Sequence, residues 1–237
     1  MVATSGLSLS LAGAPAGSDR QAPRTSRYAW RTVGTSRLRL LTYRVHYKRR
    51  VKSVSWEGRL VESKAEFKRH LHEKVEPRLR VPHPAFAKEL RELSTTRLET
   101  RFVERLLCAH IAPEAWQIGE AFAECVLLDT GKIHLPWNTL LERRTPGASP
   151  QGADLVGFYE DGPQVLLLIG EVKTSSEIAT PPRVMRGEQG LCRQLERNAG
   201  QLEIQLTLWN WLRARCRTMD SMRLYKTALR RYISSQG

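Results

Sequence analysis

The chain has 237 residues, of which 41% are hydrophobic and 26% are charged, and its formal net charge at pH 7 is +14. These values are typical of a globular protein and exclude a chain that is mostly disordered. No apolar run approaches the roughly 18 residues that span a bilayer, so no membrane segment is expected. The excess of positive charge favours polyanionic partners, of which nucleic acid is the commonest.

Cysteine usage argues against a zinc site. The chain has four cysteines, none of them in a C-x-x-C pair: Cys108, Cys125, Cys192 and Cys216. Structural zinc sites need closely spaced Cys or His ligands, and no histidine pair stands at zinc spacing near these cysteines. The wide spacing and apolar neighbours favour reduced thiols, and we therefore expect a cytoplasmic protein.

The first part of the chain divides into two regions. Residues 1–35 are rich in Ser, Ala, Gly and Pro, which predicts a disordered or poorly ordered extension. Residues 36–114 form a basic region, in which the alternation across 37–56 predicts a strand with basic side chains along one face. That face is either solvated or contacts phosphates. The candidates for nucleic-acid binding are Arg44, Lys48, Arg49, Arg50 and Lys52.

Helices follow in the same basic region and continue beyond it. Apolar residues at helical spacing, with prolines between the segments, predict helices over 63–71, 85–93 and 96–111. A further helix is expected over 115–128, where the third region, 115–237, begins. The proline-rich segment 136–150 predicts a loop.

The third region contains the most informative pattern. A short strand from Asp154 to Tyr159 is followed by a turn cluster and then by an apolar strand from Val165 to Lys173. After Pro181 and Pro182, a long helix is expected over 188–215 and a basic amphipathic helix over 219–232.

The predicted hairpin would gather three charged side chains. A turn near Asp161 brings Asp154 opposite the end of the second strand, where Glu171 and Lys173 point to one face because side chains alternate along a strand. Burying such charges costs several kcal/mol unless they are paired or bind a metal. A divalent cation relieves the repulsion between two carboxylates, and Mg²⁺ prefers a few carboxylates and several waters.

This pattern resembles the PD-(D/E)XK nuclease superfamily, with Asp154 as the first acid and Glu171-Val172-Lys173 as the E-x-K motif. Ala153 stands where the motif has proline. The resemblance implies a restriction-endonuclease-like α/β (α+β) fold, helix-rich, with a mixed central sheet flanked by helices. It also implies Mg²⁺ or Mn²⁺ held by Asp154, Glu171 and the Val172 carbonyl, and Lys173 as the catalytic lysine, with Asp154 and Glu171 also in the catalytic set.

The resemblance implies further site residues on the two neighbouring helices. Members often bring an acid from the helix before the hairpin, and Glu120 is preferred here over Glu124 as a further metal ligand, although both have the alternative of being ordinary helix formers. The helix after the hairpin supplies a glutamine in some members. Gln194 is the candidate, and its rivals are Gln201 and Gln205.

One departure from the superfamily bears on function. The superfamily core has another strand after the second helix, and residues beyond Arg213 predict only helix, so that strand is supplied elsewhere or missing. The expected function is a Mg²⁺-dependent nuclease acting on DNA or RNA, with endonuclease and exonuclease cleavage both open. The stretch LLLIGEVKTSS, which follows GADLVGF, also resembles the nuclease subunit of Hachiman-type bacterial defence systems, which works with a helicase partner.

Two other functions stay open. The first is a non-catalytic nucleic-acid-binding or assembly module on a degenerate nuclease fold. The second is a basic scaffold for a protein partner, in which Trp209 and Trp211 would serve the interface, although their spacing predicts that at least one is in the core.

Overall fold

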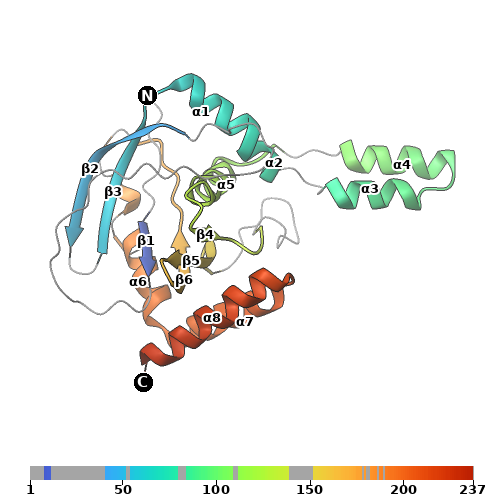
Figure 1. Ribbon diagram of the computed structural model, residues 1–237. Helices are drawn as coiled ribbons and strands as arrows, with labels where there is room; N and C mark the ends of the chain where they lie inside the picture. Colours follow the sequence, from blue (N-terminus) through green and yellow to red (C-terminus); the bar gives the residue numbers. More distant parts are fainter. Residues whose placement is uncertain are drawn as a thin grey trace.

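Helices and two antiparallel sheets make up a mixed α/β fold that is rich in helix, as expected (Figure 1). The chain is seen as a computed structural model that describes residues 8–11, 41–51, 54–79, 84–108, 112–138, 152–177, 179, 182–185, 187–188 and 190–236. Most of the predicted loop 136–150 lies outside the described residues.

The larger sheet has four strands in the order β1-β6-β5-β4. They are β1 (Ser8–Leu11), β4 (Ile133–His134), β5 (Leu155–Asp161) and β6 (Gln164–Glu171). The predicted hairpin is confirmed, with Gly162 at φ 60° in its two-residue turn. All pairings among the described strands are antiparallel, so the expectation of a mixed sheet was wrong for this part of the chain.

The N-terminal segment supplies the strand beside β6. Ser8 is paired with Glu171 and Leu11 with Leu168. We expected poor order throughout 1–35, and for these four residues that expectation was wrong. Judging this segment by composition alone overlooks its short alternation of Ser and Leu. The edge of β6 has unpaired backbone groups, and these four residues form hydrogen bonds with it as a strand. No strand follows α6 (Leu191–Gly200) in the described residues, so β1 is the second neighbour of β6.

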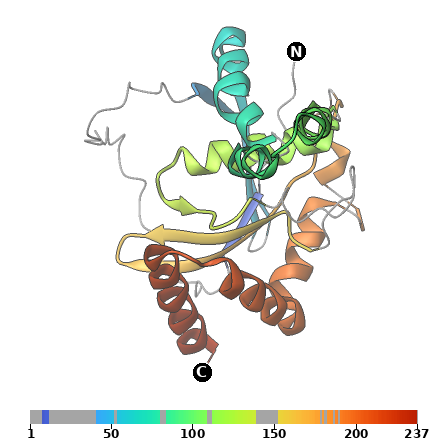
Figure 2. The ribbon, with the colours of Figure 1, turned by 90° about the vertical axis from the view of Figure 1, so that its right-hand side faces the viewer.

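Helices cover both faces of the β5–β6 hairpin (Figure 2). On one face, α5 (Ala115–Leu128) packs Ala123 and Leu127 against Leu155 and Leu168. On the other face lie α7 (Leu202–Arg215) and α8 (Met219–Gln236). The hairpin is therefore the middle layer of three, which explains why its second strand is apolar on both sides.

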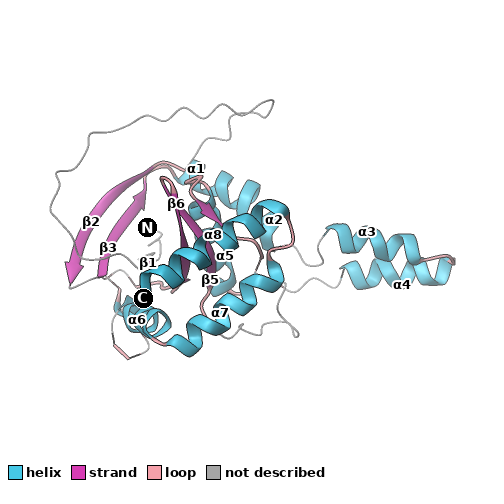
Figure 3. Ribbon diagram, turned by 60° about the horizontal axis from the view of Figure 1, so that its bottom comes forward, coloured by secondary structure: helices cyan, strands magenta, loops and turns pink. Residues whose placement is uncertain are grey.

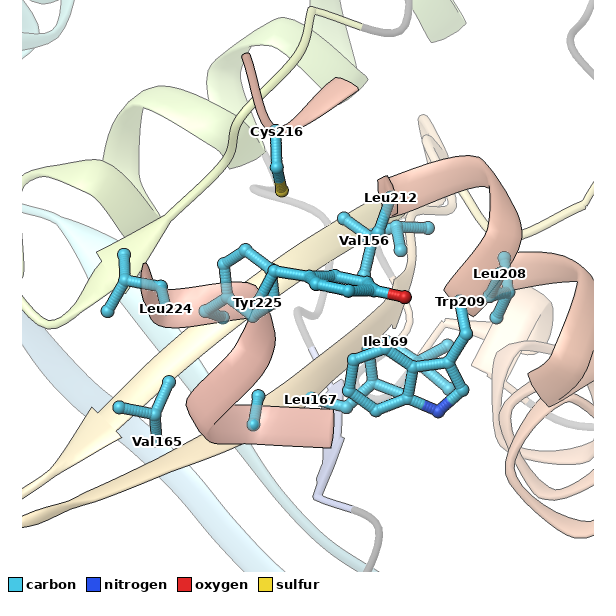
Figure 4. Packing of buried hydrophobic residues seen from close by; sticks show 12 residues of the cluster. Val156, Val165, Leu167, Ile169, Leu208, Trp209, Leu212, Cys216, Leu224 and Tyr225 are labelled. Atoms are coloured by element: carbon cyan, nitrogen blue, oxygen red, sulfur yellow. The ribbon is translucent and has the colours of Figure 1, made fainter. Parts of the chain in front are cut away.

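The core between the hairpin, α7 and α8 is built around two aromatic residues (Figure 4). The ring of Trp209 lies 5.7 Å from that of Tyr225 in an edge-to-face arrangement, and both pack with Leu167 and Ile169. Trp209 is only 4% exposed, so it is a core residue and does not serve an interface. Trp211 is half-buried, with the Arg215 guanidinium 4.2 Å from its ring centre.

The long helix predicted over 188–215 is two helices. α6 (Leu191–Gly200) ends where Gln201 adopts an extended conformation with φ −100° and ψ 115°, and α7 begins at the next residue. Gly200 weakens the helix at this point. The break lets α6 pack against β1 and β6 while α7 turns to pack against β5 and α8.

The basic N-terminal region contains a β-hairpin and a series of helices. β2 (Tyr43–Val51) pairs with β3 (Val54–Val61), and α1 (Lys64–His70) continues into a π-helical turn (Leu71–Val75) and α2 (Glu76–Leu79). The predicted helices 63–71, 85–93 and 96–111 are confirmed as α1, α3 (Pro84–Leu93) and α4 (Arg97–Cys108). A short 3-10 helix lies in the third region and spans Arg183–Met185.

Core contacts cross the domain boundary that was expected at 114/115, because Val75 packs with Ala121 and Cys125 of α5.

Among the described helices, none is both long and apolar enough to cross a membrane.

The contact between β4 and β5 depends on a glycine. A β-carbon on Gly157 would lie 2.3 Å from the main-chain oxygen of His134, which cannot move without breaking the strand pairing. Gly157→Ala should therefore destabilise the fold by about 1–3 kcal/mol, measured by chemical denaturation. Gly200→Ala, where nothing lies within 4 Å, is the matched control and should be neutral or slightly stabilising. An unchanged stability for Gly157→Ala would contradict this account.

Candidate active site

The end of the β5–β6 hairpin brings three of the predicted site residues together. Leu155 is paired with Gly170, so the preceding residue, Asp154, lies beside Glu171. The Val172 amide donates a hydrogen bond to Asp154 Oδ2 at 2.7 Å, and Lys173 Nζ donates to Glu171 Oε1 at 2.8 Å. The three side chains therefore form one cluster, as the alternation and the turn predicted.

The cluster holds more negative charge than its environment favours. Glu171 is only 6% exposed and Asp154 is half-buried. Burial first and the neighbouring Glu171 charge second raise the pKa of Asp154 to about 7, against the opposing effects of the Val172 amide and Lys173. One lysine therefore serves two carboxyl groups, and a second cation would stabilise both in their ionised form.

The donor set suits a hard divalent cation. Two carboxylates from adjacent strands, with the Val172 carbonyl next to them in sequence, match the small number of protein ligands that Mg²⁺ takes. Among the described residues, no group of three or more His, Cys, Asp and Glu side chains is arranged to hold a metal ion. The carboxylate pair is thus the part of the predicted ligand set that the structure brings together.

The two glutamates of α5 have different surroundings. Glu120 is 7% exposed and lies about one turn before Ala123, which packs against the sheet. A β-carbon on the preceding Gly119 would lie 2.0 Å from Thr174 Oγ1, so this turn of α5 contacts the chain just after Lys173. Glu120 is therefore close in the fold to the end of β6, without forming a metal-holding group with Asp154 and Glu171.

Glu124 is part of an ion pair that the sequence did not predict. It is 3% exposed and accepts hydrogen bonds from Arg78 Nε at 2.6 Å and from the same guanidinium through a terminal nitrogen. The pair joins α2 to α5, which favours a structural role for Glu124. The two residues are 46 positions apart, so no local pattern could have revealed this partner.

The three glutamines that were candidates for the site differ in burial and in hydrogen bonding. Gln205 is 5% exposed, donates to the main-chain oxygen of Ala199 and accepts from the Tyr232 hydroxyl, so it fastens α6 and α8 to α7. Gln201 is exposed at the break between α6 and α7. Gln194 lies on α6, which contacts β6, and its buried Oε1 has no hydrogen-bond partner among the described residues. Gln194 remains the candidate.

Comparison of the chain with protein-family models, curated proteins and solved structures found no match. The assignment of chemistry to this cluster therefore rests on its geometry.

The basic strand hairpin does not present its cations on one face. Arg44 is paired with Leu60, and Lys48 with Glu57, and these partners are three residues apart on β3. Because side chains alternate along a strand, Arg44 and Lys48 lie on opposite faces, and the irregularity between Val45 and Tyr47 causes this. The expectation of a single basic face was wrong for this pair. The side chains of Arg49 and Arg50 lie outside the described part, as does Lys52.

A second group of cations lies in and just before the segment that the sequence predicted to be a basic amphipathic helix, 219–232. A groove of about 610 Å³ is lined by four basic side chains together with threonine and methionine. Its cations come from α8 and the turn before it: Arg217, Arg223, Lys226 and Arg230. Positions 223, 226 and 230 share one helix face because they are three and four residues apart.

Proposed function

We propose that this chain is a Mg²⁺- or Mn²⁺-dependent nuclease that hydrolyses phosphodiester bonds of DNA or RNA, built on a restriction-endonuclease-like fold. The observation that carries the proposal is the cluster of Asp154, Glu171 and Lys173 at the buried end of β6. A surface ion pair would explain Lys173 and Glu171, since such pairs are common and worth little. It would not explain a second carboxyl group beside them with a raised pKa.

Each residue of the cluster has a role in the proposed reaction. Asp154 and Glu171, with the carbonyl of Val172, would hold the metal ion, which supplies an activated water and neutralises charge on the phosphate. The ammonium of Lys173, fixed by Glu171, would orient the attacking water or stabilise the negative charge that develops on the phosphate. Gln194 and Glu120 are candidates for support from the flanking helices.

DNA is the preferred substrate in this proposal. Cations of the groove along α8 would hold the phosphate backbone, without any readout of base sequence. A cytoplasmic role in anti-phage defence with a helicase partner remains the proposed biological setting. Arg44 and Lys48 would contribute phosphate contacts on different faces of their hairpin.

The test is cleavage by the purified full-length chain. Labelled single- and double-stranded DNA and RNA would be incubated with Mg²⁺, with Mn²⁺ or with EDTA. We expect cutting of at least one substrate that requires the metal and stops with EDTA. Binding to every substrate without cutting under any of these conditions would contradict the proposal.

A second function has two observations in its favour. The described residues hold a carboxylate pair and no larger metal-binding group, and no described strand follows α6. Both features are those of a degenerate member that binds nucleic acid or assembles a complex without catalysis. Binding that persists unchanged in Glu171→Gln, with no cleavage by either protein, would favour this function.

The rate of cleavage should depend on pH through Asp154. Metal binding requires the ionised carboxylate, and the pKa of Asp154 is raised from 3.8 to about 7. At limiting Mg²⁺, the rate should rise about tenfold per pH unit below about pH 7 and level off above it. The opposite sign applies to the metal-free fold, because a raised carboxyl pKa stabilises it at low pH and this contribution is lost as pH rises through about 7.

Two measurements check these signs. Initial cleavage rates from about pH 5 to about pH 9 should give the rising limb and the plateau, and the melting temperature without metal should fall between about pH 5 and about pH 7 and then level off. In Asp154→Asn the melting temperature should depend less on pH. A cleavage rate that falls between about pH 6 and about pH 8 would contradict the assignment of Asp154 as a ligand.

A further inference from the structure

The helical hairpin of α3 and α4 stands away from the rest of the molecule (Figure 3). The two helices contact each other, and the Arg91 guanidinium of α3 binds Glu104 of α4 at 2.9 Å. Glu99 caps the start of α4 by accepting from the amides of Thr95 and Thr96. The hairpin is thus well defined in itself, although it packs little against the body.

The hairpin exposes more apolar surface than a solvated element needs. Five large apolar residues are 47–76% exposed: Phe86, Leu93, Leu98, Phe102 and Leu106. They recur at intervals of seven on α3 and of four on α4, so each set follows one stripe of its helix. Leu93, Leu98 and Phe102 line one groove between the helices, together with Leu90 and Val103.

Helices of this length are marginal in water unless an apolar face is covered. α3 has 10 residues and α4 has 12, and Val103 is the one residue of these two helices that the structure describes as buried. At roughly 200 Å² for a fully exposed large apolar residue, the five residues expose on the order of 600 Å² per copy. This is at the upper limit of the patches found on monomeric proteins.

The charges of the hairpin identify the partner. Residues 84–108 carry five basic and four acidic side chains, for a net +1 of the chain's +14. The basic residues are Lys88, Arg91, Arg97, Arg101 and Arg105, and the acidic residues are Glu89, Glu92, Glu99 and Glu104. The rest of the chain repels a second copy, whereas this surface offers both signs beside an apolar stripe, as self-associating helices do.

We propose that a second copy of this chain covers the apolar face of the α3–α4 hairpin, so that two hairpins form a four-helix bundle across a twofold axis. The contact would bury on the order of 1,200 Å² of apolar surface in total, which reaches the lower limit for stable protein interfaces. A twofold interface uses the same patch on both copies, which a surface of mixed charge satisfies. The proposal does not depend on the nuclease activity.

The test is the mass of the full-length chain in solution. We expect sedimentation equilibrium to give a dimer at tens of micromolar that dissociates on dilution, and two differently tagged copies to co-purify when expressed together. Leu98→Glu combined with Phe102→Glu should give a monomer and abolish the co-purification. Because these residues are 76% and 57% exposed, the circular dichroism of the variant should retain its helical signal.

A matched control distinguishes this interface from nonspecific association through other exposed apolar residues. Leu206→Glu on α7 and Ile233→Glu on α8 change residues that are 64% and 63% exposed outside the hairpin, and both should remain dimeric. A wild-type chain that is monomeric at all concentrations up to about 100 micromolar would overturn the proposal, since a typical specific dimer is populated there. So would a dimer that persists in the folded double variant.

Discussion

Glu171→Gln and Lys173→Met are each expected to lower metal-dependent cleavage by about 10²–10⁴-fold. Glu171 would lose the charge that holds the metal, and Lys173 would lose the ammonium that now lies 2.8 Å from Glu171 Oε1. Glu171→Gln should still fold, because it removes charge from a buried site without adding volume. Lys173→Met leaves the buried Glu171 carboxylate without its cation and should lower stability in the absence of metal, whereas at saturating Mg²⁺ the bound metal would compensate that charge. Single-turnover cleavage of the preferred substrate, with saturating Mg²⁺, measures the effect.

The matched control is Glu160→Gln on β5. Its side chain is 38% exposed and lies 3.4 Å from His134, away from the cluster. This variant should cut at the wild-type rate. Full activity in Glu171→Gln, or equal losses in Glu160→Gln and Glu171→Gln, would mean that the cluster is not the active site. Retained substrate binding in Glu171→Gln separates loss of chemistry from loss of affinity.

Arg78→Met should destabilise the fold by about 3–5 kcal/mol, because it removes the cation that compensates a buried carboxylate. The Arg78 side chain is 23% exposed and that of Glu124 is 4% exposed, and the pair holds α2 against α5. Because α5 packs against one face of the β5–β6 hairpin, the loss should appear as a lower midpoint in urea denaturation.

Two controls accompany this prediction. Arg91→Met removes an ion pair with Glu104 in which both side chains are about half exposed, and it should leave the midpoint nearly unchanged. The double variant Arg78→Met with Glu124→Gln should recover part of the loss, because no uncompensated charge then stays buried. A double variant less stable than Arg78→Met would contradict this explanation.

The β5–β6 hairpin and its cluster were predictable because their determinants are local. A turn centred on Gly162 sets the register of two strands that follow one another in the chain, and that register alone places Asp154 beside Glu171. Alternation then puts Lys173 on the face of Glu171. The helices α1, α3, α4 and α5 were predictable for the same reason, since apolar spacing and the prolines between them act within a few residues.

The partners of the site were not predictable, because they come from distant parts of the chain. The strand β1 pairs with β6 across some 160 residues of sequence, and its four residues carry too little pattern to be seen alone. Glu120 and Glu124 lie four residues apart on one face of the predicted helix, and Glu120 was the preferred site residue. Only the packing of α5 between the sheet and α2 places Glu120 near the end of β6 and pairs Glu124 with Arg78.

The sequence by itself therefore determined the hairpin, the identity of its three charged residues and the helices whose apolar spacing is regular. Tertiary structure alone decided the neighbour of β6, the break between α6 and α7, the faces of Arg44 and Lys48, and the exposure of the α3–α4 hairpin. The physical reason is the distance along the chain over which each interaction acts. Turn and periodicity effects act over a few residues, whereas strand edges, buried charges and uncovered apolar faces are satisfied by whichever segment the whole chain brings to them.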